Sequence, residues 1–142
     1  MHDPQLNQLA GGFMEAIARS SERMNAFAQQ LSVAGDFNIV TTGVDFRAYE
    51  SGWRFEKFVE AAPKNQAHQF AVWWLELGFD GNQWRIDTAI YVTNGDYRHE
   101  FAPMIASTIR ECAEQLELAT AQLKSSYAQG SEFRTILDDL RS

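Results

Sequence analysis

Apolar residues in the first quarter of the chain recur at the spacing of an α-helix. They are Leu6, Leu9, Phe13, Ile17, Met24, Phe27 and Leu31. Steps of three, four or seven residues place them on one helix face. Asp3 and Pro4 suit an N-cap and a first helical position, and Gly35 suits the end of a helix. The pattern predicts an amphipathic helix between Pro4 and Gly35, weakened at the Gly11–Gly12 pair.

The middle of the chain, Phe37 to Thr93, has short runs of β-branched and aromatic residues separated by turn residues. Such runs without intervening helices predict an antiparallel meander of about four strands. Gly43 is expected to form a bulge or bend in the first strand. We expect AAPKNQAHQ (61–69) to be a connection because Pro63 cannot donate within a central strand, and NGDYRHE (94–100) to lead the chain out of the sheet.

The last third of the chain returns to helical spacing. Ile105, Ile109, Cys112, Leu116, Ala119 and Leu123 form one apolar seam. Pro103 suits the first turn of this long helix, and Ser131 suits the cap of a short final helix after Gly130. The order of elements predicts an α+β fold with the helices on one face of the sheet. At 142 residues, we expect a single domain, 1–142.

The long seam has two interpretations. It can pack on the protein's own sheet or first helix, or it can form a coiled-coil homodimer. The seam is at the lower length limit for a coiled coil, and its flanking charges do not pair clearly. Packing within the chain is therefore favoured, with the homodimer as the alternative.

The best-defined element is a hairpin, in which Phe70–Phe79 and Trp84–Thr93 flank DGNQ. Gly81–Asn82 suits a two-residue turn, which sets the strand register. On one face of the hairpin, this register makes four cross-strand pairs: Phe79 faces Trp84, Leu77 faces Ile86, Leu75 faces Thr88 and Trp73 faces Ile90. Because nearly all of these side chains are large and apolar, we predict that they form the core beneath the helices.

The other face of the hairpin has a different composition. Here the register opposes Val72 with Tyr91, Trp74 with Ala89, Glu76 with Asp87 and Gly78 with Arg85. Directly opposed like charges destabilise a sheet, so the pair Glu76–Asp87 needs an explanation. Alternation places Asp45, Arg47, Arg54 and Glu56 on this same face. The explanations are a lattice of ion pairs with these arginines, an interface for a basic partner, or a carboxylate pair for catalysis or metal binding.

Charge and cysteine content narrow the function. The net charge is −7 and the twelve basic residues are scattered, which disfavours nucleic-acid binding. The single cysteine, Cys112, excludes an intramolecular disulfide, and its place in the apolar seam favours a buried thiol over a reactive one. No apolar run approaches the ~20 residues of a membrane span, and the N-terminus lacks a secretory signal. We expect a cytoplasmic protein.

The sequence contains no catalytic motif. His2, His68 and His99 are not at metal-ligand spacing, and HEFAP lacks the second histidine of the helical zinc pattern. Neither G-x-S-x-G nor a phosphate-binding glycine loop occurs. The sequence therefore predicts a protein that is not an enzyme and has no metal or cofactor.

The chain resembles the bacterial immunity proteins of polymorphic and contact-dependent toxin systems. The resemblance lies in its acidic α+β character and in the segment WWLELGFDGNQWRID, Trp73 to Asp87. This resemblance implies a cytoplasmic, non-catalytic protein that binds a cognate toxin, often a basic nuclease, and blocks its active site. The expected partner-binding residues are Arg54, Glu56, Trp74, Glu76, Asp87 and Tyr91. Two alternatives are a type III secretion chaperone for an effector and a small α+β ligand-binding or enzyme domain.

Overall fold

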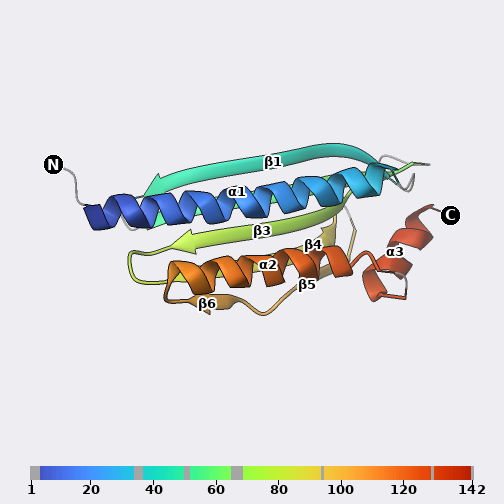
Figure 1. Ribbon diagram of the computed structural model, residues 1–142. Coiled ribbons are helices and arrows are strands. Elements are labelled where there is room, and N and C mark those ends of the chain that lie inside the picture. The colour runs from blue at the N-terminus through green and yellow to red at the C-terminus, as the bar shows by residue number, and fades with distance from the viewer. Residues whose placement is uncertain are drawn as a thin grey trace.

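The alternating middle of the chain forms an antiparallel sheet, and the helical segments pack on one side of it (Figure 1). The structure is a computed structural model that describes residues 4–33, 37–49, 52–64, 69–93, 95–128 and 130–141. The elements are α1 (Pro4–Val33), β1 (Phe37–Tyr49), β2 (Gly52–Pro63), β3 (Ala71–Phe79), β4 (Trp84–Val92), β5 (Arg98–Glu100), β6 (Met104–Ala106), α2 (Ile109–Ser125) and α3 (Glu132–Arg141). The described strands form a six-stranded sheet in the order β1-β2-β3-β4-β5, with β6 also paired to β4. The α+β prediction is confirmed, with two more strands than expected.

The β3–β4 hairpin has the predicted register throughout. Trp73 pairs with Ile90 and Phe79 with Trp84, and these four side chains are buried in the core. Gly81 has a positive φ of 100°, as a tight turn requires. The Asp80 carboxylate accepts the backbone N–H groups of Gln83 and Asn82 at 2.9 Å, and these bonds lower the pKa of Asp80. The turn is thus held by its own side chain.

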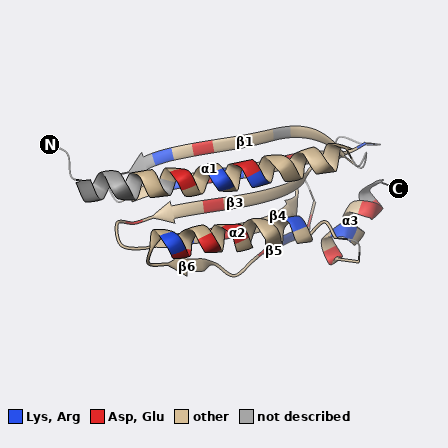
Figure 2. Cartoon of the chain, viewed as in Figure 1, with Lys and Arg blue, Asp and Glu red and all other residues tan. Residues whose placement is uncertain are grey.

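Helices α1 and α2 lie side by side along the same side of the sheet (Figure 1). Helix α1 begins at Pro4 as predicted, whereas Asp3 and Gly35 lie outside the described residues. Gly12 is a point of close approach, because a Cβ there would lie 2.6 Å from the Ile109 side chain. Charged residues of both signs lie along both helices (Figure 2), and Arg23 joins Glu117 across the two at 2.8 Å.

The apolar seam of α2 faces this interior. Its buried residues are Cys112, Leu116, Ala119, Thr120 and Leu123. Packing within the chain, the favoured interpretation of the seam, is confirmed. Burial raises the pKa of Cys112 to about 12, so its thiol stays protonated near neutral pH. No helix among the described residues is long and apolar enough to cross a membrane.

The segment between the hairpin and α2 differs from the prediction. Arg98–Glu100 stays in the sheet as β5 and pairs with Ala89–Tyr91 of β4. Pro103 does not begin a helix, and Ile105 belongs to β6 rather than to the helical seam. Helix α2 starts later, where the Thr108 side chain accepts the Glu111 N–H at 3.1 Å. The Glu111 carboxylate accepts the Ser107 N–H in return, so the Thr108-x-x-Glu111 capping signal outweighs the proline.

Two predictions in the first strands were also wrong. The register shift of β1 falls between Ile39 and Thr41, not at Gly43. Gly43 instead lies beneath the ring of Phe58, its partner on β2. A Cβ on Gly43 would come within 2.1 Å of that side chain. Pro63 ends β2 and faces Phe37 rather than lying in a connection. A proline at a strand end removes no hydrogen bond from the strand's interior, which is why it is tolerated at this position.

Candidate functional site

The face of the sheet opposite α1 and α2, here called the open face, collects all six residues predicted to bind a partner. The registers place Arg54, Glu56, Trp74, Glu76, Asp87 and Tyr91 on it. Their strand neighbours, such as Phe55 and Leu77, point the other way and are buried beneath the helices. Alternation therefore separates a core face from an open face as predicted.

Four carboxylates cross the open face in one line, here called the acidic row: Asp45, Glu56, Glu76 and Asp87. Each faces the next directly on the neighbouring strand. The row extends the predicted Glu76–Asp87 pair over β1 to β4. Directly opposed like charges oppose sheet formation, so the row costs folding free energy wherever it is not neutralised.

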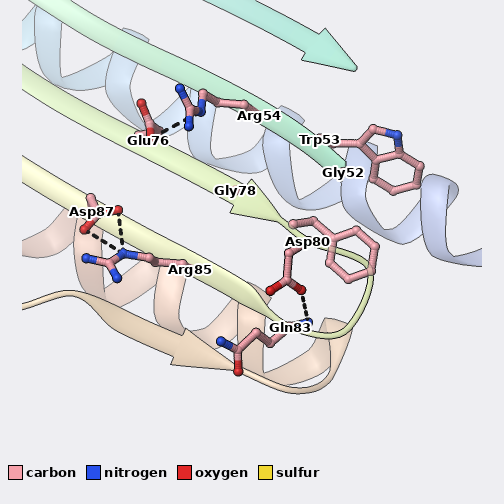
Figure 3. A pocket seen from close by; sticks show the side chains of 10 residues that line it. Gly52, Trp53, Arg54, Glu76, Gly78, Asp80, Gln83, Arg85 and Asp87 are labelled. Atoms are coloured by element: carbon pink, nitrogen blue, oxygen red, sulfur yellow. Dashed lines mark hydrogen bonds and ion pairs between the residues drawn. The ribbon is translucent and has the colours of Figure 1, made fainter. Parts of the chain in front are cut away.

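A second line, here called the arginine row, runs beside the first: Arg47, Arg54, Gly78 and Arg85. Each arginine makes an ion pair with a carboxylate of the acidic row (Figure 3 shows two of them). The Nε–carboxylate distances are 2.9 Å for Arg47–Asp45, 3.5 Å for Arg54–Glu76 and 3.1 Å for Arg85–Asp87. The predicted ion-pair lattice is therefore present. Its arginines are more than half exposed, so solvent screens each pair and its contribution to stability is small.

Gly78 leaves a hollow in the arginine row because it has no side chain. The hollow has a volume of about 400 Å³ and lies between Arg54 and Arg85, with Trp53, Asp80 and Gln83 at its end (Figure 3). A Cβ on Gly78 would meet only the Trp53 carbonyl oxygen, at 3.9 Å. Close backbone packing therefore does not require glycine here, and the position leaves room for a group from outside.

Glu76 lies in the centre of the acidic row with its side chain 21% exposed. Desolvation raises its pKa most, Arg54 opposes this, and the charges of Glu56 and Asp87 raise it further. The net shift is upward despite the ion pair. The surroundings of Glu76 thus disfavour its negative charge, and an added positive group would relieve this.

We expect Glu76→Gln to raise the melting temperature slightly at pH 7, with the gain fading as the pH falls. Because the folded-state pKa lies above the unfolded one, ionised Glu76 weakens the fold above that pKa. This cost disappears once the carboxyl is protonated in both states. Thermal unfolding from about pH 4 to pH 8 measures the effect. Glu114→Gln, which removes an exposed carboxylate–arginine pair on α2, is the control; a variant less stable than wild type at pH 7 would contradict the expectation.

Aromatic side chains occupy the other half of the open face. Phe58 lies over Gly43 and faces Trp74, which in turn faces Ala89. Tyr91 lies beneath the Arg98 guanidinium, 4.9 Å from its ring centre, and burial raises the pKa of Tyr91. Trp74 and Tyr91 are half-buried. The open face thus presents apolar contact area beside a charged lattice, a composition typical of protein interfaces.

Other reactive side chains are bound into the fold. Lys57, not singled out by the sequence, is buried under α1, and its Nζ donates to Asn25 Oδ1 at 2.7 Å. Burial lowers the pKa of Lys57. The sequence did contain a signal for this burial, because Lys57 lies on the same side of β2 as the core residues Phe55 and Val59.

Serine hydroxyls occur near His99, in a hollow of about 270 Å³ between the sheet and α3. Ser126 donates to the Leu123 carbonyl and Ser131 to the Ser126 carbonyl, so both hydroxyls bond to the backbone. His68 and His2 lie outside the described residues. Among the residues that are described, no three His, Cys, Asp or Glu side chains are grouped to hold a metal ion.

Comparison with known proteins adds no relative: no protein-family model, curated protein or solved structure matches the chain.

Proposed function

We propose that the chain is a non-catalytic binding protein whose open face receives a protein partner. The observation that carries the proposal is the acidic row, placed on a face without a described helix and next to half-buried Trp74 and Tyr91. A sheet that only supported its helices would gain by alternating charges across the strands. A partner would add positive charge beyond the ion pair of Glu76 with Arg54 and would cover the aromatic side chains.

The class of partner that fits this face is a basic toxin domain, and the chain would act as its immunity protein. The net charge of −7 favours encounter with a basic protein. A polar side chain of the toxin could enter the hollow over Gly78, which carboxylates and the guanidinium groups of Arg54 and Arg85 line together. Blocking the toxin in this way needs shape and charge complementarity but no chemistry from this chain.

We expect the triple variant Trp74→Ala, Glu76→Lys, Asp87→Lys to lose protection against the toxin while its melting temperature stays near that of wild type. The toxin is sought in the open reading frame next to the gene and coexpressed with each variant. Growth rescue and the dissociation constant of the purified complex are the measurements. Loss of an interface aromatic and two charges predicts at least a hundredfold weaker binding, about 3 kcal/mol.

The matched control is Leu118→Ala, Glu114→Lys, Glu117→Lys on the exposed side of α2. It makes the same charge change and also removes two exposed ion pairs, so it should protect like wild type. Gly78→Ala is a second test, because its Cβ meets no close atom and so keeps stability, yet it narrows the hollow and should weaken binding. Full protection by the open-face variant would refute the proposal. A copurifying, non-toxic secreted effector would instead support the chaperone alternative.

A further inference from the structure

Strand β1 forms an edge of the sheet. It pairs with β2 on one side, and no described strand pairs with its other side. From Thr41 to Tyr49 its register is continuous. Sheet edges are commonly shortened or interrupted by proline or lysine, and β1, thirteen residues long, contains neither. The register shift near Ile39 interrupts only the start of this edge, so the stretch from Thr41 to Tyr49 can accept another strand.

Two apolar side chains on this edge are exposed although they lie on the helix side of the sheet. Val44 is 60% exposed and Phe46 is 44% exposed. Their partners on β2 are Lys57 and Phe55, both buried, so the helix layer covers β2 more completely than this part of β1. A strand added here would bring both side chains out of water.

The charges of β1 are complementary to those of a second copy of the same strand. Asp45 and Arg47 flank Phe46 on the open face, and Figure 2 shows an acidic and a basic band near the end of β1. In an antiparallel pair with its two-fold axis at Phe46, Asp45 of each copy opposes Arg47 of the other. A shift of the axis to Asp45 or to Arg47 would oppose like charges. The charges therefore favour one register.

We propose that two copies of the chain associate through their β1 strands, antiparallel, with Phe46 opposite Phe46 on the two-fold axis. The symmetry is isologous, so each copy contributes the same surface. The two sheets join into one, both helix layers lie on the same side, and the two open faces become continuous. Asp45 and Arg47 belong both to this interface and to the rows of the open face, but the dimer uses the edge of β1 and does not depend on the proposed partner.

Site-directed crosslinking tests the register. In Phe46→Cys the two new thiols face each other, with Cβ atoms about 4.5–5.5 Å apart, and mild oxidation should link two chains. In the control Val44→Cys each thiol opposes residue 48 of the other copy, so the two lie about 13 Å apart and should not link. The native thiol, Cys112, is buried and does not interfere.

Charge reversal tests the interface without relying on oxidation. Asp45→Arg and Arg47→Asp should each weaken the dimer about tenfold, because each places like charges opposite one another twice. A mixture of the two variants should form a heterodimer, since every opposed pair is then of opposite charge. Each variant also loses the Arg47–Asp45 ion pair within its own chain, but mixing the two variants does not restore that pair. Its loss therefore cannot explain why the mixture dimerises. Sedimentation equilibrium measures the mass, and circular dichroism verifies that each variant is folded.

Two outcomes would overturn the proposal. One is a wild-type chain that stays monomeric at the highest soluble concentration. The other is equal crosslinking of the Phe46→Cys and Val44→Cys variants together with no rescue in the mixture. If β1 instead pairs only with a strand of another protein, the wild-type chain is monomeric, which is the first of these outcomes.

Discussion

Trp73→Ala is expected to lower the free energy of unfolding by about 3–5 kcal/mol, because it removes a fully buried tryptophan from the core. The indole is fully buried in β3 at the centre of that core. Four rings meet it edge-on, with centroid distances from 5.2 Å for Phe27 to 6.5 Å for Tyr127. Its Nε1–H donates to Ser126 Oγ at 2.8 Å, which ties the sheet to the turn after α2. Alanine would leave a cavity lined by these groups.

A pair of conservative variants separates packing from hydrogen bonding. Trp73→Phe leaves Ser126 without its donor and should cost about 1–3 kcal/mol. Trp84 is also buried, but its Nε1 has no hydrogen-bond partner among the described residues. Trp84→Phe removes that unsatisfied donor and should be nearly neutral. Urea unfolding followed by circular dichroism measures all three variants; equal losses for the two phenylalanine variants would refute the role of the Ser126 bond.

Gly52→Ala is expected to lower the free energy of unfolding by about 3 kcal/mol. Gly52 begins β2 with a φ of +151°. A Cβ there would lie 1.8 Å from the carbonyl oxygen of Phe79 at the end of β3. Because that atom belongs to the backbone, no side-chain rotation can relieve the clash, and the ends of β2 and β3 would have to separate. The measurement is again urea unfolding.

Two other glycines provide a graded comparison for Gly52. Gly81 has a φ of +100° but open space around it, so Gly81→Ala should cost only the conformational strain, about 1 kcal/mol. Gly78→Ala meets no close atom and should be neutral or stabilising by about 0.5–1 kcal/mol. A Gly52→Ala variant no less stable than Gly81→Ala would show that the backbone yields easily and that the steric argument is wrong.

Local signals were enough to predict the hairpin and the core. The turn at Gly81 and strict alternation set the β3–β4 register, so Trp73, Leu77 and Ile86 were placed in the core correctly. Each of these inferences uses residues that are close in sequence. The cap of α3 is a similar case, since Ser131 Oγ accepts the Arg134 N–H at 3.0 Å.

Signals that conflict locally led to wrong predictions. Pro103 resembles a helix start, and Ile105 continues the helical spacing of the seam. Ile105 instead lies in β6, a three-residue strand that pairs with the outer edge of β4, and Pro103 directly precedes it. A strand this short has no periodicity of its own to read. The sequence has a capping signal at Thr108, where the helix starts. The helical spacing of apolar residues, however, already begins before Thr108 and so obscures this start.

The sequence by itself determined which residues alternate, and hence the α+β fold, the hairpin register and the membership of the open face. Only the tertiary structure decided how distant strands align. Asp45 and Glu56 come into line with Glu76 because the β1–β2 pairing and the β2–β3 pairing happen to place all three at matching positions. Alternation is a property of neighbouring residues, whereas register between separate hairpins is a property of the whole core. The acidic row, the hollow over Gly78 and the exposed edge of β1 therefore became visible only in three dimensions.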